Sequence, residues 1–255
     1  MRLGSHMSIA GGVENAVLRG QEVGCEAIAM FTKNNNQWKA KPLTQEDADR
    51  FRAALLETGI HPVVAHTSYL INLASSSREV LEKSVHLLIR ELDQADSLDA
   101  EYVVLHTGSA SQETGEIGRK KAVQALRLVS GQGKWKAKIL LENTAGERGD
   151  ISSRVEDLAE IIESTGNNLI GGVCIDTCHA FQAGYDIANK EGLLKITGEI
   201  KNYVGFGSVK LIHLNDSKRG FHSRVDRHDH IGSGSIGEDG LGRFINHPGL
   251  RDVPI

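Results

Sequence analysis

Several apolar stretches of this 255-residue chain end on a residue that can bind a metal ion. The five closing residues are His66, His106, Glu142, Asp176 and His213. Imidazole and carboxylate groups together are typical ligands of zinc, and manganese or iron can take its place. A single histidine is more often a hydrogen-bonded structural residue, so it is the repeated pattern that indicates a metal centre.

Two further segments add side chains of the same kind. His179 lies just after the fourth stretch, and Asp226 and His228 are two residues apart, so they would share one side of an extended chain. Eight ligands are too many for one four-coordinate ion, which implies two or three ions that share a bridging carboxylate. Cys174 and Cys178 could form another metal pair, but cysteine is commonly buried for packing alone.

These side chains need a scaffold that brings distant segments together. Short β-branched runs alternate with longer amphipathic stretches, which is typical of an α/β fold. The predicted strands are Arg2–His6, Ala27–Phe31, Pro62–His66, Tyr102–His106, Ile139–Glu142, Gly172–Asp176 and Val209–His213. The predicted helices are Glu14–Val23, Thr44–Thr58, Ser76–Leu98, Gly118–Val129 and Val155–Ser164. We predict a turn at Gly171-Gly172, before a strand, and a loop over Gly232–Gly242.

The number of strands favours one barrel over an open sheet. Seven strand-and-helix steps precede residues 251–255, which look like the start of an eighth strand. We therefore expect a single TIM-like (β/α)8 barrel domain over residues 1–255, truncated as the eighth strand begins. In this fold the carboxyl ends of the strands converge on one rim, where active sites lie. The sequence predicts that the ligand residues meet there.

Composition narrows the class of protein. Forty per cent of the residues are hydrophobic, which allows a sizeable core, and we find neither a membrane-spanning run nor a signal peptide. Three cysteines are an odd, sparse set that favours a reducing, cytoplasmic location. The net charge of -4 is not the basic signature of a nucleic-acid-binding protein, so such a site must be local or depend on bound cations.

Motifs over essentially the whole chain resemble the endonuclease IV family. The matching segments are Gly4–Ser8 with Gly11-Gly12, Phe31–Asn34, His66–Ala74, Leu141–Gly146, Cys174–Ala180, His213–Lys218 and Asp226–Gly232. The resemblance implies three zinc ions and no organic cofactor. The first ion would be held by His66, His106 and Glu142. The second would share the bridging Glu142 and be held with Asp176 and His213. The third would be held by His179, Asp226 and His228.

The same resemblance implies a DNA repair endonuclease that acts on duplex DNA containing an abasic site, and we expect the protein to be a monomer. It would hydrolyse the phosphodiester on the 5′ side of the lesion, leaving a 3′-hydroxyl and a 5′-deoxyribose phosphate. Zinc would make hydroxide available near neutral pH and offset charge on the phosphate and on the departing oxygen. Flipping a nucleotide that lacks a base costs less stacking energy, which favours the abasic site.

Five residues are candidates for contact with DNA. Tyr69 and Leu70 match the family's loop that inserts into the base stack, although ordinary loop packing would also explain them. We predict that Lys33, Lys218 and Arg227 contact phosphates, against the alternative that they are solvated surface charges.

Three departures from the family pattern leave other functions open. The family's ninth ligand, a glutamate on the eighth strand, is not reached before Ile255. Asn36 stands where many members of the family have a basic residue. Asp229 stands where a histidine is common. A sugar isomerase or epimerase of the xylose isomerase-like group is one alternative, although the third ion goes beyond what such isomerases need. A DNA-lesion binder without catalytic activity is the other, because one ligand is missing.

Overall fold

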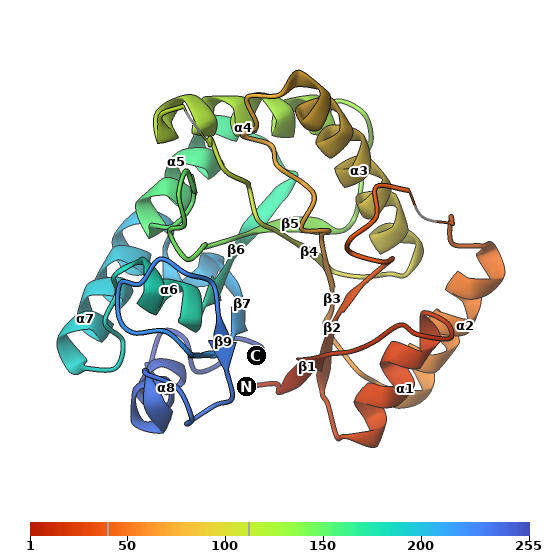
Figure 1. The fold of residues 1–255 in the computed structure, drawn as a ribbon. Helices are drawn as coiled ribbons and strands as arrows, with labels where there is room; N and C mark the ends of the chain where they lie inside the picture. The colour runs from red at the N-terminus through yellow and green to blue at the C-terminus, as the bar shows by residue number, and fades with distance from the viewer. Residues whose placement is uncertain (40, 112) are drawn as a thin grey trace.

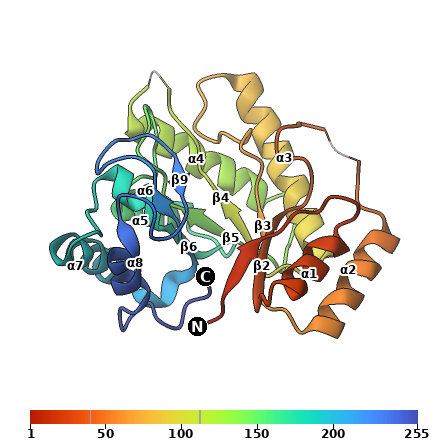
Figure 2. The ribbon, with the colours of Figure 1, turned by 60° about the horizontal axis from the view of Figure 1, so that its bottom comes forward.

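Seven parallel strands curl around a common axis, in sequence order, with the helices outside them (Figures 1 and 2). The computed structural model describes residues 1–39, 41–111 and 113–255. The strands are β1 Gly4–His6, β2 Ala27–Phe31, β3 Val63–His66, β4 Tyr102–Leu105, β5 Lys138–Glu142, β6 Ile170–Asp176 and β7 Val209–His213. Each lies at or within two residues of its predicted bounds, and the predicted TIM-like barrel is confirmed.

The helices cover the outer face of the barrel. They are α1 Glu14–Glu22, α2 Gln45–Thr58, α3 Arg78–Ser97, α4 Gly115–Ser130, α5 Val155–Thr165, α6 Thr177–Ala183, α7 Lys190–Glu199 and α8 Gly237–Ile245. A π-helical turn η1 (Ile200–Val204), a 3-10 turn η2 (Phe206–Ser208) and a small ribbon of β8 (Asp216–Ser217) and β9 (His228–Asp229) complete the fold. Thr44 and Ser77 begin α2 and α3 by accepting hydrogen bonds from backbone amides. No helix within the described residues is long and apolar enough to cross a membrane.

Two layers of apolar side chains show which side chains of each strand point outward and which point into the barrel. The larger layer lies between the strands and the helices. The smaller layer fills the inside of the barrel and consists of Val64, Val104, Leu140, Cys174 and Leu211. Each of these five residues lies two positions before one of the predicted ligand residues. Because residues two apart share a face of a strand, the ligand side chains also point inward.

The last residues of the chain lie between β1 and β7, the two edges of the sheet (Figure 1). The Ile212 amide donates to the Pro254 carbonyl at 2.9 Å, and the Ile255 amide donates to the Arg2 carbonyl at 2.9 Å. The Gly4 amide in turn donates to the Ile255 carbonyl at 2.7 Å. Pro254 and Ile255 therefore bond to both edges at the place where we predicted the eighth strand to begin.

Two predictions made from glycines are wrong. Gly171 and Gly172 lie inside β6, where the register with β5 shifts between Ile139 and Leu140. Gly172 has a φ of 152°, and a Cβ atom there would lie 2.2 Å from the Ser208 carbonyl oxygen, so glycine serves close strand packing and makes no turn.

The second wrong prediction concerns Gly232–Gly242, whose second half belongs to α8. This helix forms because Leu241 and Phe244 bury an apolar face against the barrel. A Cβ atom on Gly240 would lie 3.0 Å from the backbone of Ile187 and Ala188, so the glycine allows close approach of the helix.

Candidate metal centre

One cavity of about 660 Å³ opens at the carboxyl ends of the strands and contains every predicted ligand residue. Four of them end strands β3, β5, β6 and β7, and a fifth directly follows β4. The other three come from α6, from β9 and from the loop before β9. The eight predicted ligands among its lining residues are His66, His106, Glu142, Asp176, His179, His213, Asp226 and His228.

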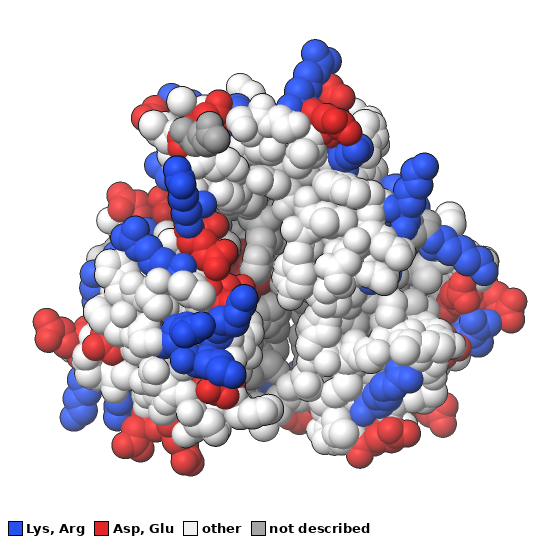
Figure 3. Space-filling view, in the orientation of Figure 1, with Lys and Arg blue, Asp and Glu red and all other residues white. Residues whose placement is uncertain are grey.

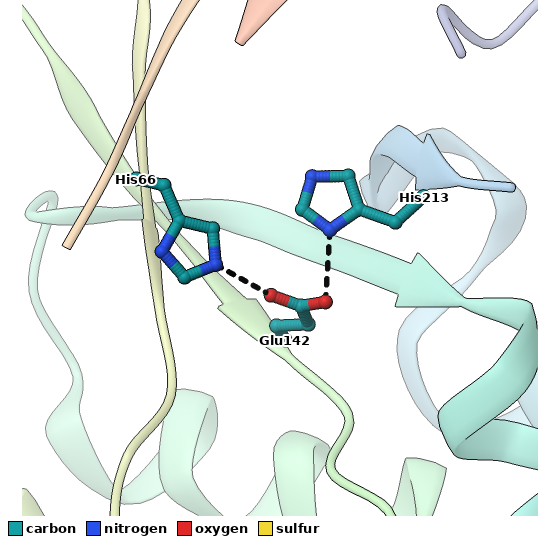
Figure 4. A group of neighbouring side chains, drawn as sticks. All are labelled: His66, Glu142 and His213. Carbon is teal, nitrogen blue, oxygen red and sulfur yellow. Dashed lines mark hydrogen bonds and ion pairs between the residues drawn. The ribbon is translucent and has the colours of Figure 1, made fainter. Parts of the chain in front are cut away.

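Glu142 is the centre of the first cluster (Figure 4). Its Oε2 atom lies 2.8 Å from His106 Nε2 and 3.2 Å from His66 Nε2, and its Oε1 atom lies 2.8 Å from His213 Nδ1. Burial alone would raise the pKa of Glu142, but His213 and His106 hold it well below its usual value. The residue is therefore a buried carboxylate that faces three imidazoles with both of its oxygens.

A second cluster lies beside the first and combines two histidines with one carboxylate. His179 Nε2 and His228 Nε2 each lie 3.3 Å from an oxygen of Asp226, and the two nitrogens lie 3.3 Å from each other. Burial alone would lower the pKa of His179, but the carboxylates of Asp176, Asp226 and Glu142 raise it to about 10. The carboxylates of this cluster therefore favour positive charge at the His179 ring.

Asp176 lies between the two clusters and is held in place by its neighbours. Its carboxylate accepts hydrogen bonds from the His179 amide at 2.8 Å and from Asn215 Nδ2 at 2.7 Å. Asp176 Oδ2 lies 3.8 Å from His228 Nε2, and His179 Nδ1 lies 3.6 Å from Glu142 Oε1. The two clusters thus form one continuous group of donors.

Backbone carbonyls orient two of the imidazoles. His66 Nδ1 donates to the Thr67 carbonyl at 2.8 Å, and His179 Nδ1 donates to the Asn143 carbonyl at 2.9 Å. Each bond leaves Nε2 of the same ring directed into the cavity, which is the usual arrangement of a histidine that binds a metal.

The donor atoms are close enough together to share metal ions. Within the described residues, four groups have all their donor atoms within 4.8 Å of one another. They are His66 with Glu142 and His213, His106 with Glu142 and His179, Asp176 with Cys178 and His228, and His179 with Asp226 and His228. The last group matches the third ion's expected ligands, whereas His106 and His213 are grouped differently from the expected sets. Imidazole nitrogens with carboxylate oxygens fit zinc or a similar divalent ion.

The predicted DNA contacts have different surroundings. The Tyr69 side chain is 59% exposed at the cavity mouth, with its ring centre 5.5 Å from that of His66, and Leu70 beside it is half-buried. Lys218 and Arg227 are exposed. Lys33, in contrast, is buried, and its ammonium is used within the protein, contrary to the predicted phosphate contact.

Lys33 has three oxygen partners. Its Nζ atom donates to the carbonyls of Asn34 at 3.0 Å and Gln37 at 2.8 Å and lies 3.4 Å from Glu91 Oε1. The side chain therefore holds the loop after β2 against α3.

Several residues of the site are absent from the sequence-based set. His6 ends β1, and its ring centre lies 6.3 Å from that of His66. The same signal, a histidine at a strand end, could have identified it. Asn143 accepts a hydrogen bond from the Asp176 amide at 2.8 Å, but amides are common in loops and give no such signal.

Burial raises the pKa of both Cys174 and Cys178 to about 12, which favours the packing role for these thiols.

A groove runs across the face that carries the cavity (Figure 3). Lysine and arginine gather on one bank, over β9 and α6, whereas the opposite bank carries few charges (Figures 1 and 3). Four basic residues of the segment 218–227 are exposed, namely Lys218, Arg219, Arg224 and Arg227. A local basic surface thus exists in a protein whose net charge is negative.

Comparisons with known proteins agree on the fold and the family. Residues 17–255 match the family model described as "Xylose isomerase-like TIM barrel". "Probable endonuclease 4" of Chloroflexus aurantiacus is 43% identical over 255 residues, which cover all of this chain and 90% of that protein. The crystal structure of endonuclease IV from Thermus thermophilus is 39% identical, with a TM-score of 0.87 over all of this chain and 90% of that one.

A more distant structure shares the fold alone. A "D-tagatose 3-epimerase-like protein" has a TM-score of 0.75 but is only 21% identical, covering all of this chain and 89% of that one. Sequence identity over the full length therefore groups this chain with the endonuclease 4 relatives. Within the xylose isomerase-like TIM barrels, this chain belongs to the endonuclease IV family.

Proposed function

We propose that this protein is a metal-dependent DNA repair endonuclease that cleaves duplex DNA at abasic sites and acts as a monomer. One observation carries the proposal. The residues that would bind metal in this family lie together in one cavity, which opens into a groove with a basic bank (Figure 3). A negatively charged protein would engage DNA through this local surface and through bound cations.

The proposed cofactor is zinc, three ions in all, with manganese as a substitute. Glu142 would bridge two ions, because both of its oxygens face imidazoles. His179, Asp226 and His228 would hold the third ion. When bound, the ions would supply a hydroxide nucleophile near neutral pH and would offset charge on the phosphate and the leaving oxygen.

The protein's own residues would prepare the site for this chemistry. The imidazoles that flank Glu142 keep it ionised, so it is ready to act as a ligand. His66 and His179 present Nε2 without rearrangement, since their Nδ1 atoms are already bonded to carbonyls. Such preorganisation lowers the cost of reaching the reactive geometry. We propose hydrolysis on the 5′ side of the lesion, leaving a 3′-hydroxyl and a 5′-deoxyribose phosphate.

Recognition of DNA would combine an inserted side chain with phosphate contacts. Tyr69 lines the cavity and Leu70 follows it in the chain, so the two side chains would replace the missing base in the stack. Lys218 and Arg227 are exposed and would contact phosphates from the basic bank. Asn36, on the exposed loop after β2, offers a hydrogen bond but no charge.

The decisive experiment uses a 5′-labelled duplex with one tetrahydrofuran abasic analogue, with an intact duplex as the matched control. Incubation with the purified protein should produce a single cut 5′ to the analogue with a 3′-hydroxyl, and a chelator should abolish it. Tight binding to the abasic duplex without a cut would favour the non-catalytic lesion binder. Turnover of a ketose, together with an uncut duplex, would favour the sugar isomerase.

A further inference from the structure

Asp216 is a fully buried carboxylate that no part of the proposed mechanism uses. It lies in β8, three residues after the end of β7. The carboxylate accepts hydrogen bonds from five backbone amides. These belong to Ser217 at 2.8 Å, Gly232 at 3.0 Å, Gly234 at 3.1 Å, Ile236 at 2.9 Å and Gly237 at 3.2 Å. So many donors indicate that the negative charge itself is part of the fold.

Four of the five amides belong to residues 232–237, the segment that joins β9 to α8. The fit between this segment and the carboxylate is tight. A Cβ atom on Gly234 would lie 2.5 Å from Asp216 Oδ1 and 2.5 Å from the Ser217 carbonyl oxygen. Only glycine can therefore occupy this position without a shift of the loop. The segment is wrapped around one carboxylate.

The same stretch of chain carries a proposed ligand of the third ion. In the β8–β9 ribbon, Ser217 pairs with His228 and Asp216 pairs with Asp229. The Ser235 amide donates to the Ser217 carbonyl at 2.8 Å. Residues 228–237 are thus fixed at one end by the ribbon and at the other by the Asp216 carboxylate.

The ribbon is also joined to α6, which carries His179. Gln182 Nε2 donates to Ser217 Oγ at 2.9 Å and to the Arg227 carbonyl at 3.1 Å. These bonds connect the helix, β8 and the residue just before His228. They act on the relative position of His179 and His228, whose Nε2 atoms lie 3.3 Å apart.

We propose that Asp216 is a positioning residue for the third metal ion. Its carboxylate fixes the loop after β9, and through the ribbon it sets His228 against His179 and Asp226. The proposal rests on the proposed function, since it concerns that function's metal site. An asparagine could not replace Asp216, because its NH2 group would face amide donors and leave some of them without an acceptor.

The test compares Asp216→Asn with the wild-type protein by metal analysis after dialysis against buffered zinc. We expect two tightly bound ions instead of three, with the affinity for the third ion reduced about 10- to 100-fold. Hydrogen exchange should speed up at residues 228–237 and stay unchanged in α1 to α4. Asp47→Asn is the matched control, because Asp47 also accepts from a backbone amide, that of Thr44, in a helix cap outside the metal centre.

Gly234→Ala provides a second route to the same answer if Asp216→Asn does not fold. Its methyl group would push the loop away from the carboxylate, and the third ion should again be lost first. Three ions bound with wild-type affinity in a folded variant would overturn the role of Asp216. Fewer than three ions in the wild-type protein would instead refute the metal assignment, so the two failures are distinguishable.

Discussion

At the scale of single residues, Glu142 does most to define the candidate metal centre. It receives imidazoles from the ends of β3 and β7 (Figure 4) and from the residue after β4, so three separate segments depend on one carboxylate. A neutral residue of the same size would keep the volume but lose the charge that balances them.

Replacing Glu142 with glutamine should therefore reduce cleavage of the abasic duplex by at least about 100-fold, with loss of bound metal. Steady-state cleavage rates and metal content measure the effect. Glu163→Gln on the exposed face of α5 is the matched control and should change neither quantity. Activity within a few-fold of wild type in Glu142→Gln would refute the bridging role.

Tyr69→Ala should weaken binding to abasic duplex by roughly 10-fold, since stacking of a base on an aromatic ring is worth about 1–3 kcal/mol. The exposed ring has room to contact DNA, so the melting temperature should stay nearly constant. Titration of a fluorescent duplex gives the affinity. Tyr203→Ala removes another exposed tyrosine, in η1, and should bind like wild type. Equal losses in both variants would contradict the insertion role.

At this scale, the sequence predicted that residues of a metal-binding type at the ends of strands would lie close together. The ligand-type residues at strand ends converge because side-chain alternation in a buried strand fixes their direction. The prediction from the sequence failed for Lys33, whose burial depends on Glu91, 58 positions away in the chain. A lysine in a loop gives no sign of such a distant partner.

At the scale of elements, β6, which ends at Asp176, contains a shift of register against β5. Gly172 lies at this shift with a φ of 152° and packs against the Ser208 carbonyl. Gly172→Ala should lower the free energy of unfolding by more than about 2 kcal/mol, from backbone strain and steric overlap together.

Gly198→Ala in α7 is the natural comparison, because its Cβ atom would meet nothing within 4 Å. This substitution should raise the free energy of unfolding by up to about 1 kcal/mol, the usual preference of a helix for alanine over glycine. Urea unfolding of both variants measures whether each substitution lowers or raises the free energy of unfolding. Destabilisation by both, or by neither, would contradict this account of β6.

The loops after β2 and β3 are joined to α3 through Glu91. Its carboxylate accepts the Ser68 amide at 3.1 Å, next to Tyr69, and lies 3.4 Å from Lys33. Burial, only partly offset by Lys33, raises the pKa of Glu91 to about 7. Because this pKa is higher in the folded than in the unfolded protein, the stability contribution is complete at low pH and is lost as pH rises through about 7.

The stability of wild type relative to Glu91→Gln should therefore fall by on the order of 2 kcal/mol between about pH 5 and pH 8, at 1.4 kcal/mol for each pKa unit. Chemical denaturation at a series of pH values gives this difference, and subtraction removes the titration of all other groups. A difference that is independent of pH, or that grows with pH, would refute the assignment.

Sequence reasoning missed α6 and α8 for two different physical reasons. All seven residues of α6 are buried, so the helix shows no amphipathic period that could reveal it. In α8 the glycines suggested a loop, but tertiary packing of Leu241 and Phe244 outweighs their low helix propensity. The five helices predicted correctly are amphipathic, and Thr44 and Ser77 cap two of them.

At the scale of the whole molecule, charge and metal content are linked. The net charge is -4, and the cavity concentrates the buried carboxylates Glu142 and Asp176. Three divalent ions would more than cancel this net charge. The barrel and the place of its last residues could be predicted from the sequence, whereas the hydrogen bonds of Pro254 and Ile255 to both sheet edges are seen only in the structure.

Removal of metal should both destabilise the protein and weaken its binding to DNA. An ion at 100 times its dissociation constant contributes about 2.7 kcal/mol, so a chelator should lower the melting temperature by several degrees. Calorimetry and a duplex titration, each with and without chelator, test both effects. Glu142→Gln should respond much less to the chelator, and an equal response would argue against ions at this centre.

The Lys33–Glu91 pair has a practical consequence for observing the enzyme. It fixes a loop that carries Trp38, one of only two tryptophans in the chain, while Trp135 is hydrogen-bonded to Asp93, also on α3. Replacing Trp135 with phenylalanine would leave Trp38 as the single indole emitter, in a loop that Glu91 joins to the Ser68 amide next to Tyr69. Its intrinsic fluorescence could then follow the arrival and departure of unlabelled oligonucleotides in real time.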